Sequence, residues 1–350
     1  MDTIFHIGAR AVGPSLPVYI VAELSANHRQ SFDQAVALIH AACDAHVDAI
    51  KLQTYTADTL TIRSDREYFR IGGGTLWDGR TLYELYQEAY TPWEWQPKLQ
   101  QIAHECGLEC FSSAFDASAV DFLERMDVPV HKVASFELVD LPLIQTMART
   151  GKPLILSTGM ATLAEIDEAV QAARSAGAQE IMLLKCTSAY PAAPAAMQLH
   201  AIPQLQQRYN VPIGLSDHTL DTTVPIAAVA LGACFIEKHL TLSRATPGPD
   251  SAFSLEPAEF KALVEAVRTA EAALGTGAMG DDAGEAKSRI FRRSLFVVAE
   301  MQAGEAFTPA TVRSIRPAHG LPPKHLPEIL GRRAKCALPA GTPLTWDCVE

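Results

Sequence analysis

The chain has 350 residues, of which 48% are hydrophobic, so it can bury one large core and a smaller additional one. Its formal net charge of -11 excludes the basic surface that sequence-independent binding of nucleic acid requires. The seven cysteines form no Cys-x-x-Cys pair, and the first residues lack a signal-peptide pattern, so we expect a cytoplasmic protein that does not associate with a membrane.

Short apolar segments rich in β-branched residues alternate with amphipathic segments from Val18 to about Ala273. This pattern is typical of repeated strand–helix units. It predicts an α/β fold, a closed (β/α)8 TIM barrel, over residues 1–275. The eight predicted strands are Val18–Leu24, Ala49–Gln53, Leu108–Ser112, Val130–Ala134, Pro153–Ser157, Ile181–Lys185, Pro212–Ser216 and Phe235–His239.

Helix-start signals precede three of the predicted helices. Ser31 with Gln34, and Thr162 with Glu165, have the spacing of a capping box, in which two side chains satisfy free amide groups at a helix start. Pro257 stands where the last barrel helix begins, a position that tolerates the missing amide hydrogen. Apolar residues at helical spacing follow each signal and predict the face that packs on the barrel.

A long insertion interrupts the pattern between the second strand and its helix, from Thr54 to about Trp95. It is too long for a simple connection, and its glycine-rich IGGGTLWDG segment lacks the Lys-Ser/Thr ending of a phosphate-binding loop. Two interpretations remain open, a lid over the substrate and a flexible loop without a role.

The segment LGTGAMGDDAGEA has the composition of a linker, which we place at residues 276–287. We expect a second domain at residues 288–350. Its sequence contains a short internal repeat with turn glycines, which predicts a β-rich module built from two similar hairpins. The two copies are Ala303-Gly304-x-x-Phe307-Thr308-x-x-x-Val312 and Ala340-Gly341-x-x-Leu344-Thr345-x-x-x-Val349.

Two histidines end neighbouring strands of the predicted barrel. His218 follows Ser216 at the end of the seventh strand, and the eighth strand ends in Glu237, Lys238 and His239. Strand alternation places Glu237 and His239 on one face and Lys238 on the other. A single strand histidine is usually a packed core residue, but two imidazoles at matching positions can bind a divalent metal ion and leave positions for water and substrate. Glu237 could orient such a water.

Lysines and hydroxyl side chains recur where other strands end, and together they offer the charge and donors that a phosphate requires. Taken singly, each serine is better explained as a turn cap. His131, next to one of the lysines, is expected to face the outer helices. The anion-binding candidates are Lys51, Gln53, Ser113, Lys132, Ser135, Ser157, Thr158 and Ser188.

Three carboxylates, Glu23, Glu137 and Asp250, also follow predicted strands. Acid–base catalysis and recognition of sugar hydroxyls are both possible roles. Helix capping is the simpler role for Asp250. Glu23 ends an apolar strand, where an unpaired charge would be costly, so a functional role is favoured there.

Seven strings in the chain resemble the sialic acid synthase superfamily: AELSANH, KLQTYT, HKVASFE, ILSTGM, KCTSAYP, GLSDHT and IEKH. The C-terminal SIRPAHGLPPKHL is similar to the superfamily's SAF, or antifreeze-like, β-clip domain. Three longer strings are similar to the pseudaminic acid synthase branch: GGTLWDG, TLYELYQEAYTPWEW and CFSSAF.

The resemblance implies that the chain condenses phosphoenolpyruvate with 2,4-diacetamido-2,4,6-trideoxy-L-altrose and water, giving pseudaminic acid and phosphate. It implies a metal site for Mn2+ or another divalent ion at His218 and His239. It implies a domain-swapped homodimer in which Arg316 of one chain reaches the other chain's site. The implied phosphoenolpyruvate ligands are Lys51, Ser113, Lys132, Ser135, Ser157, Ser188 and Ser216, and the implied sugar ligands are Glu137, Tyr190, Asp250 and Arg316.

In the implied reaction the metal polarises the sugar aldehyde, and carbon–carbon bond formation leaves positive charge on C2 of the enol phosphate. Glu23 either stabilises that cation or activates the water that adds to it. Synthesis of N-acetylneuraminate or legionaminate is the alternative within the class. A non-catalytic sugar-binding protein is the alternative outside it, because barrels have many functions.

Overall fold

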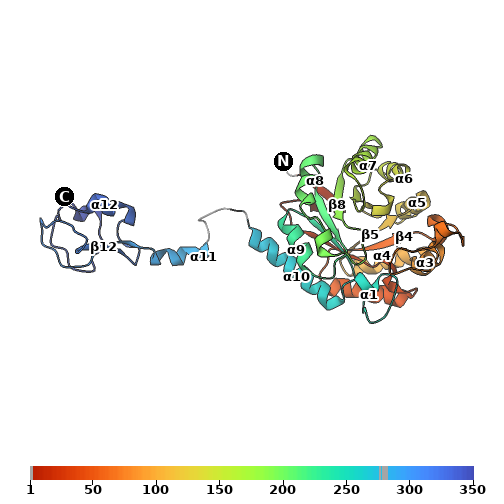
Figure 1. Ribbon diagram of the computed structural model, residues 1–350, viewed down its shortest axis with the longest axis horizontal. Helices are drawn as coiled ribbons and strands as arrows, with labels where there is room; N and C mark the ends of the chain where they lie inside the picture. Colours follow the sequence, from red (N-terminus) through yellow and green to blue (C-terminus); the bar gives the residue numbers. More distant parts are fainter. Residues whose placement is uncertain (1–2, 276, 278–282) are drawn as a thin grey trace. The chain divides into compact units, whose positions relative to one another are not determined.

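Eight parallel strands close into a barrel in the computed structural model, which describes residues 3–275, 277 and 283–350 (Figure 1). The last barrel strand pairs with the first, so the predicted closed barrel is confirmed. Each predicted strand end lies within two residues of the observed one. The strands are β3 (Tyr19–Glu23), β4 (Ala49–Thr54), β5 (Glu109–Ala114), β6 (His131–Val133), β7 (Leu154–Ser157), β8 (Ile181–Cys186), β9 (Ile213–Asp217) and β10 (Phe235–His239).

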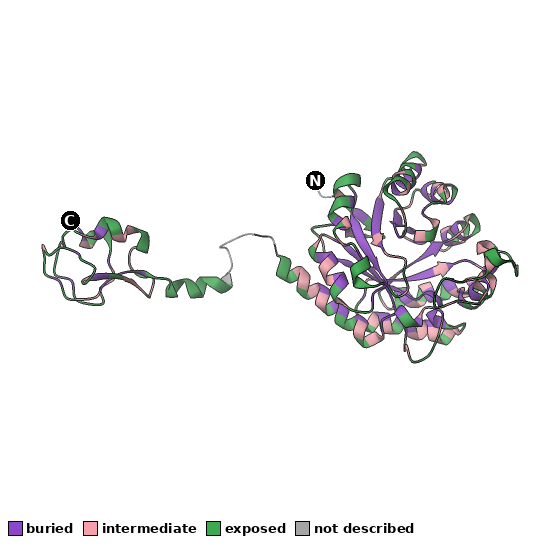
Figure 2. Ribbon diagram, viewed as in Figure 1, coloured by how far each residue is buried: buried purple, intermediate pink, exposed green. Residues whose placement is uncertain are grey.

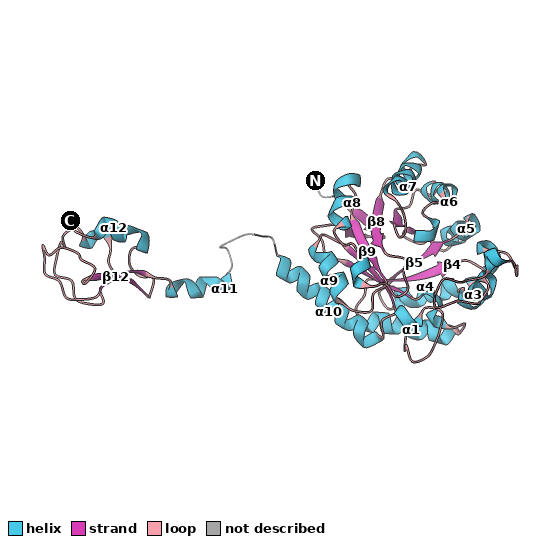
Figure 3. Cartoon of the chain, in the orientation of Figure 1, coloured by secondary structure: helices cyan, strands magenta, loops and turns pink. Residues whose placement is uncertain are grey.

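Helices surround the barrel, with buried faces on the strands and exposed faces outward (Figures 2 and 3). Thr162 and Glu165 form the full predicted capping box, and Pro257 begins the last barrel helix. The other predicted box is only half formed, because Ser31 accepts the Gln34 amide without a return bond from the Gln34 side chain. The helices are α1 (Phe32–Asp44), α4 (Gln96–Glu105), α5 (Ala117–Arg125), α6 (Leu141–Ala148), α7 (Leu163–Ser175), α8 (Ala201–Tyr209), α9 (Thr223–Ala230) and α10 (Pro257–Leu274).

An N-terminal hairpin that the sequence analysis did not predict covers the start of the barrel. Strands β1 (Phe5–Ile7) and β2 (Arg10–Val12) pair antiparallel, and their apolar side chains join the barrel core. The Arg10 guanidinium lies 5.0 Å from the ring centroid of Tyr19, the first residue of β3. The hairpin therefore covers the end of the barrel where the strands begin, which leaves the opposite end for a site.

Lys238 and Asp217 form a buried ion pair on the side of β10 that faces away from Glu237 and His239. Lys238 Nζ donates to Asp217 Oδ2 at 2.5 Å and to the backbone oxygen of Thr219. Neither charged side chain is exposed. The predicted alternation along β10 is confirmed, and the position of Lys238 is explained by its partner rather than by a substrate.

The insertion between β4 and α4 is folded, and the structure describes all of it. It contains α2 (Ala57–Leu60) and α3 (Leu82–Ala89), and a capping box of Thr81 and Glu84 fixes the start of α3. Leu85 and Ala89 are buried on one face of α3. The insertion therefore contains regular structure, and which of its two interpretations holds stays a prediction.

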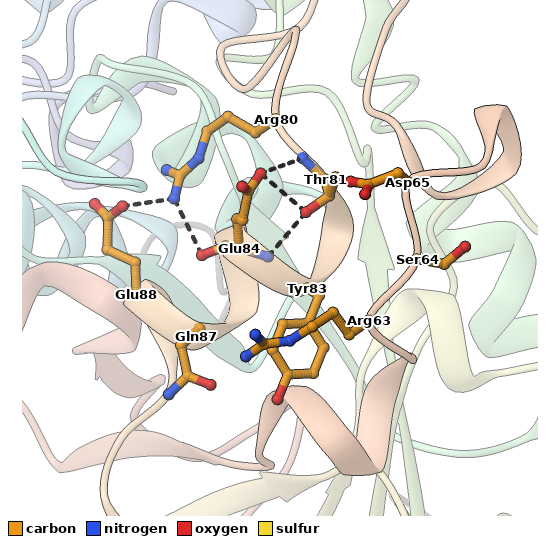
Figure 4. Close-up of a pocket in the computed structure, with 9 residues that line it drawn as sticks. All are labelled: Arg63, Ser64, Asp65, Arg80, Thr81, Tyr83, Glu84, Gln87 and Glu88. Atoms are coloured by element: carbon orange, nitrogen blue, oxygen red, sulfur yellow. Dashed lines mark hydrogen bonds and ion pairs between the residues drawn. The ribbon is translucent and has the colours of Figure 1, made fainter.

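A surface pocket of about 460 Å3 lies on this insertion, lined partly by the outward face of α3 (Figure 4). Its charged groups largely satisfy one another: Arg80 bonds Glu88 and the Glu84 carbonyl oxygen, and Tyr83 lies under the Arg63 guanidinium at 4.8 Å. It contains none of the predicted site residues. The pocket is thus separate from the polar groups at the strand ends.

The remaining part of the chain, Gly275–Glu350, forms a second compact unit with its own core. It contains α11 (Ala283–Ala286), β11 (Ser294–Val297), β12 (Val312–Ile315) and α12 (Leu326–Ile329). Of the expected linker 276–287, residues 276 and 278–282 lie outside the described residues, and its end forms α11.

The internal repeat accounts for the core of this unit. The large apolar residues of both copies are buried, and both glycines have positive φ, +78° and +91°, which favours glycine at these turns. The regular strands are fewer than two hairpins predict, since β11 and β12 form one two-stranded sheet and the other pairings are single bridges. Across the described chain no helix is long and apolar enough to cross a membrane.

The buried ion pair gives a stability prediction. Lys238→Met should lower the free energy of unfolding by about 3–5 kcal/mol, because it leaves Asp217 charged and unpaired in the interior. Adding Asp217→Leu should restore most of that loss. Urea unfolding of the single and double variants measures both effects.

The matched control is Asp167→Asn, which breaks the half-exposed pair with Arg208 and should cost at most about 1 kcal/mol. An Lys238→Met chain as stable as the unchanged protein would contradict the account of this pair.

Candidate active site

Glu237 forms the centre of a polar network inside the barrel. Its Oε1 atom accepts hydrogen bonds from Lys51 Nζ at 2.6 Å and Ser216 Oγ at 3.3 Å, and Lys132 Nζ lies 4.0 Å away. These side chains come from β10, β4, β9 and β6, so the network spans the interior. Burial favours the neutral acid, but the charges of Lys132 and Lys51 lower the pKa of Glu237 to about 2. Glu237 is therefore an anion at neutral pH.

Lys51 lies between two carboxylates. Besides Glu237 it contacts Glu23 Oε2 at 2.8 Å, and Gln53 Nε2 donates to the other oxygen of Glu23 at 3.0 Å. Glu23 is thus paired, as the cost of an isolated buried charge requires. Burial lowers the pKa of Lys51 to about 7 against the opposing effect of Glu237. The carboxylates of Glu23 and Glu237 therefore largely neutralise the positive charge of Lys51.

Lys132 has a different environment. Its Nζ atom donates to Ser157 Oγ at 2.6 Å and to the backbone oxygen of Val133 at 3.1 Å, and both acceptors are neutral. Its nearest described carboxylate oxygen is the one of Glu237 at 4.0 Å. An ammonium group has three donors, so one remains for a ligand. Lys132 is the buried cation in this network with the most capacity for an additional anion.

The remaining predicted hydroxyl groups lie beside this network. Ser113 is buried and pairs in register with both Gln53 and Lys132. Ser135 Oγ accepts the amide of Gly159 at 3.1 Å. A Cβ atom at residue 159 would lie 2.2 Å from Ser188 Oγ and 2.7 Å from Ser135 Oγ, so only glycine fits between them.

The side chain of Thr158 turns away from this group. Its hydroxyl donates to the backbone oxygen of Leu184 at 3.0 Å, so its role is structural. The structure thus brings together lysines and hydroxyls from six neighbouring strands, β4 to β9, and the residues that follow them.

His218 and His239 face each other, with ring centroids 5.4 Å apart. His218 Nδ1 lies 2.9 Å from the backbone oxygen of Thr187, which can only accept, so Nδ1 carries the proton and Nε2 has a free lone pair. His239 Nδ1 hydrogen-bonds Ser25 Oγ at 3.1 Å. Burial, with the neighbouring His218 second, lowers the pKa of His239 well below its usual value. Both rings are held in the way that ligating imidazoles are oriented by outer partners.

The donor set fits a divalent metal bound partly by substrate. In their neutral forms the two imidazoles can supply nitrogen ligands, and Glu237 Oε2 is buried without a hydrogen-bond partner among the described residues. The described residues contain no group of three or more histidine, cysteine or carboxylate side chains arranged for a metal. A metal ion held by the two imidazoles would therefore need further ligands from water or substrate.

The carboxylates expected to face a sugar are both perturbed by burial. Glu137 Oε2 is buried and unpaired among the described residues, and burial raises the pKa of Glu137 to about 7. Asp250 accepts the Ala26 amide at 3.2 Å, and burial raises its pKa too. Near neutral pH, Glu137 is therefore present in both its protonated and its ionised form. The protonated form can donate a hydrogen bond to a sugar hydroxyl, and the ionised form can accept one.

Aromatic side chains lie against the histidines. The Tyr190 ring centroid is 4.4 Å from that of His218, and Phe253 lies 4.9 Å from both Tyr190 and His239. Trp77, from the insertion, lies 5.8 Å from Tyr190, and its Nε1 donates to Pro249 O at 2.9 Å. The insertion therefore reaches the predicted site, which is what its interpretation as a lid requires.

Three contacts near the histidines were missed by the sequence analysis. Ser25 holds His239, Phe253 covers both rings, and Cys186 Sγ lies 4.0 Å from His218 Nδ1. Burial alone would raise the pKa of the Cys186 thiol, but its interaction with His218 lowers it to about 7. Cys186 has a local signal, since it ends the inward face of β8 and pairs with Ser216.

Two residues from the sequence analysis, His131 and Arg316, have other surroundings. His131 Nε2 contacts Glu124 on α5 at 2.8 Å, which confirms that it faces the helices. Arg316 is exposed in the C-terminal unit, after β12.

Comparisons with known proteins agree with this geometry. The NeuB family model matches residues 38–279, and the SAF domain model matches residues 292–350. A pseudaminic acid synthase from Campylobacter jejuni is 46% identical over 317 residues, 91% of this chain and 92% of its own. One from Helicobacter pylori is 45% identical over 335 residues, 95% and 98% of the two chains.

A solved structure with a similar fold is the N-acetylneuraminic acid synthetase of Leptospira borgpetersenii in complex with citrate. Its TM-score is 0.73 at 30% sequence identity, over 82% of this chain and 95% of that chain. The fold is therefore shared with a sugar-acid synthase, and in this chain a SAF domain follows the barrel.

The raised pKa of Glu137 predicts a pH-dependent stability. The unfolded chain ionises this carboxyl near its usual pKa of 4.5, whereas the folded chain retains the proton up to about 7. The folded state therefore binds more protons between these values, and the contribution of Glu137 to stability falls as pH rises through that window. Relative to the unchanged protein, Glu137→Gln should gain on the order of 3 kcal/mol between pH 4.5 and 7.

Urea unfolding at both pH values measures this difference. Glu168→Gln, at an exposed position of α7, is the control and should show no such change. Equal pH dependence in the unchanged and Glu137→Gln proteins would rule out a perturbed Glu137.

Proposed function

The chain belongs to the NeuB family, and on that basis we propose that it is a phosphoenolpyruvate-dependent pseudaminic acid synthase. It condenses phosphoenolpyruvate with 2,4-diacetamido-2,4,6-trideoxy-L-altrose and water, and it releases pseudaminic acid and phosphate. One observation supports the reaction class most strongly. Two buried lysines and a set of hydroxyl groups lie beside the pair of histidine rings. The acceptor is supported by the 45–46% identity to pseudaminic acid synthases.

Lys132 and the neighbouring serines bind the phosphoenolpyruvate anion in this proposal. Lys132 has a free donor, and Ser157 is held against it at 2.6 Å. Lys51 donates to the Glu237 oxygen that lies near Lys132, and it holds that carboxylate in place. Fixed donors inside a barrel need little reorganisation when an anion arrives, which favours binding and lowers the barrier. The same set includes Ser113, Ser135, Ser188 and Ser216.

His218 and His239 hold the divalent ion, Mn2+ or a similar metal, in this proposal. When bound there, the ion supplies Lewis-acid polarisation of the sugar aldehyde. Thr187 and Ser25 orient the two rings by bonding their Nδ1 atoms. Tyr190 and Phe253 limit the access of water to the same place.

Glu23 acts on the positive charge that develops during the reaction in this proposal, and Glu237 orients a water. Bond formation between C3 of phosphoenolpyruvate and the aldehyde carbon leaves positive charge at C2, to which water adds before the C–O bond to phosphate breaks. Glu23 is held by Lys51 and Gln53, so its charge is fixed in position. A fixed carboxylate can stabilise the cation or accept a proton from the water.

The second subunit completes the site in this proposal. Four apolar side chains follow β6 and β7 near the site and are more than half exposed, namely Phe136, Val139, Met160 and Leu163. A cluster of this kind suits a protein partner. A second copy of the chain, with Arg316 on its SAF domain, is the partner that we propose.

The acceptor assay tests the proposal directly. With phosphoenolpyruvate and Mn2+, the protein should release phosphate and form a nine-carbon acid fastest with the altrose derivative. N-acetylmannosamine and the legionaminate precursor are the comparison acceptors. A preference for either would change the assignment to N-acetylneuraminate or legionaminate synthesis, and sugar binding without turnover would favour a non-catalytic protein.

The histidine pair is tested by metal binding. His239→Ala should weaken Mn2+ binding at least about a hundredfold, since even the loss of an outer partner weakens metal sites by 10–100-fold. The variant should stay folded by circular dichroism, because the ring lies at the end of β10. Titration with Mn2+ measures the affinity, with His200→Ala, an exposed histidine, as the control. Unchanged affinity in His239→Ala would refute the site.

A further inference from the structure

A layer of aromatic side chains lies beyond the polar network on β4 and β5. Gln53 pairs with Ser113 in register, and both face the interior. Alternation makes Tyr55 and Phe115 the next positions on that face, about 7 Å further along the strands. Their ring centroids are 5.0 Å apart at 71°, an edge-to-face contact. The two rings therefore continue the inner wall of the barrel above the predicted phosphoenolpyruvate site.

The insertion adds a third ring to this layer. Tyr86 lies on α3 and is not among the residues that line the surface pocket, and its ring centroid is 5.8 Å from that of Tyr55. Besides burial, the charge of Asp250 raises the pKa of Tyr55 and that of Glu137 raises the pKa of Tyr86. The layer thus lies near both carboxylates that we expect to contact the sugar.

The two tyrosines have hydroxyl groups with no partner in the described chain. Tyr55 is only 3% exposed, yet its hydroxyl hydrogen-bonds no described residue, and the same holds for Tyr86. Neither hydroxyl is among the side-chain atoms that are buried without a partner, so both are accessible to a ligand. Two such groups beside apolar ring faces suit a ligand that has both an amide oxygen and methyl groups.

We propose that Tyr55, Tyr86 and Phe115 form the subsite for the part of the acceptor farthest from its aldehyde, which includes the C4 acetamido group and the C6 methyl group. This inference rests on the proposed function. The phenol groups donate to the acetamido oxygen, and the ring faces pack on the two methyl groups. The subsite distinguishes this acceptor from sugars with hydroxyl groups at C4 and C6, which lack the amide oxygen and would bury hydroxyls against apolar rings.

The test compares two acceptors that differ only at C4. These are 2,4-diacetamido-2,4,6-trideoxy-L-altrose and 2-acetamido-2,6-dideoxy-L-altrose, which has a hydroxyl group at C4. Tyr86→Phe and Tyr55→Phe should each lower kcat/KM for the diacetamido sugar by about tenfold, the effect of one lost hydrogen bond. They should change kcat/KM for the C4-hydroxyl sugar by less than about threefold, and the KM for phosphoenolpyruvate should stay unchanged.

Tyr68→Phe is the matched control, since Tyr68 lies on the same insertion but is 87% exposed. It should leave the preference between the two sugars unchanged. Because Tyr86 is on a surface helix, Tyr86→Phe tests the subsite even if the buried Tyr55→Phe chain folds poorly.

The outcomes separate two kinds of failure. If the unchanged enzyme prefers the diacetamido sugar and Tyr86→Phe keeps that preference, the subsite is wrong and the proposed function stands. An equal loss on both acceptors would also overturn the subsite, because the tyrosines would then act on a feature that the two sugars share. If the unchanged enzyme prefers N-acetylmannosamine, the proposed function fails, and the subsite assignment fails with it.

Discussion

A carboxylate buried between two lysines constrains this structure more than any other interaction. Glu237 remains ionised inside the barrel only because Lys51 contacts it at 2.6 Å and Lys132 lies 4.0 Å away. The pairing holds Lys51, and the charge of Glu237 offsets the nearby charge of Lys132, which makes both lysines less costly to bury. Lys51 in turn holds Glu23, and Lys132 holds Ser157. These side chains therefore hold one another in place without any contribution from a ligand.

The histidine pair lies on the same two strands as Glu237 and Ser216 of the polar network. This proximity limits the reactions that the site could catalyse. Glu237 and His239 are two residues apart on one face of β10, and Ser216 and His218 have the same spacing on β9. In the proposed function, a metal ion at the histidines would therefore lie next to an anion at the lysines. In the proposed reaction one group activates an aldehyde and the other positions an enol phosphate, so the barrel sets the distance between the reacting carbons.

Strand periodicity accounts for the features that were predictable from the sequence. The repeated apolar segments gave the eight strands, and alternation within one strand gave the opposite faces of Lys238 and His239 and the outward position of His131. Contacts between distant segments leave no such pattern. The bond from Ser25 to His239, the contact of Trp77 with Tyr190, and the N-terminal hairpin depend on how loops meet in space. The roles of the site residues remain predictions, because position alone does not assign chemistry.

The central claim is that Lys132 is the cation that binds phosphoenolpyruvate, and its most direct test is a binding measurement. Calorimetric titration of phosphoenolpyruvate into Lys132→Met and Lys185→Met compares a lysine on β6 with a lysine on β8. Lys185 is the control, since its Nζ atom donates to Cys186 O and Thr187 Oγ1 rather than to the network. The account predicts affinity at least about a hundredfold weaker for Lys132→Met, from loss of a charge-assisted bond, and near-normal affinity for Lys185→Met. Equal affinity of Lys132→Met and the unchanged protein would contradict it.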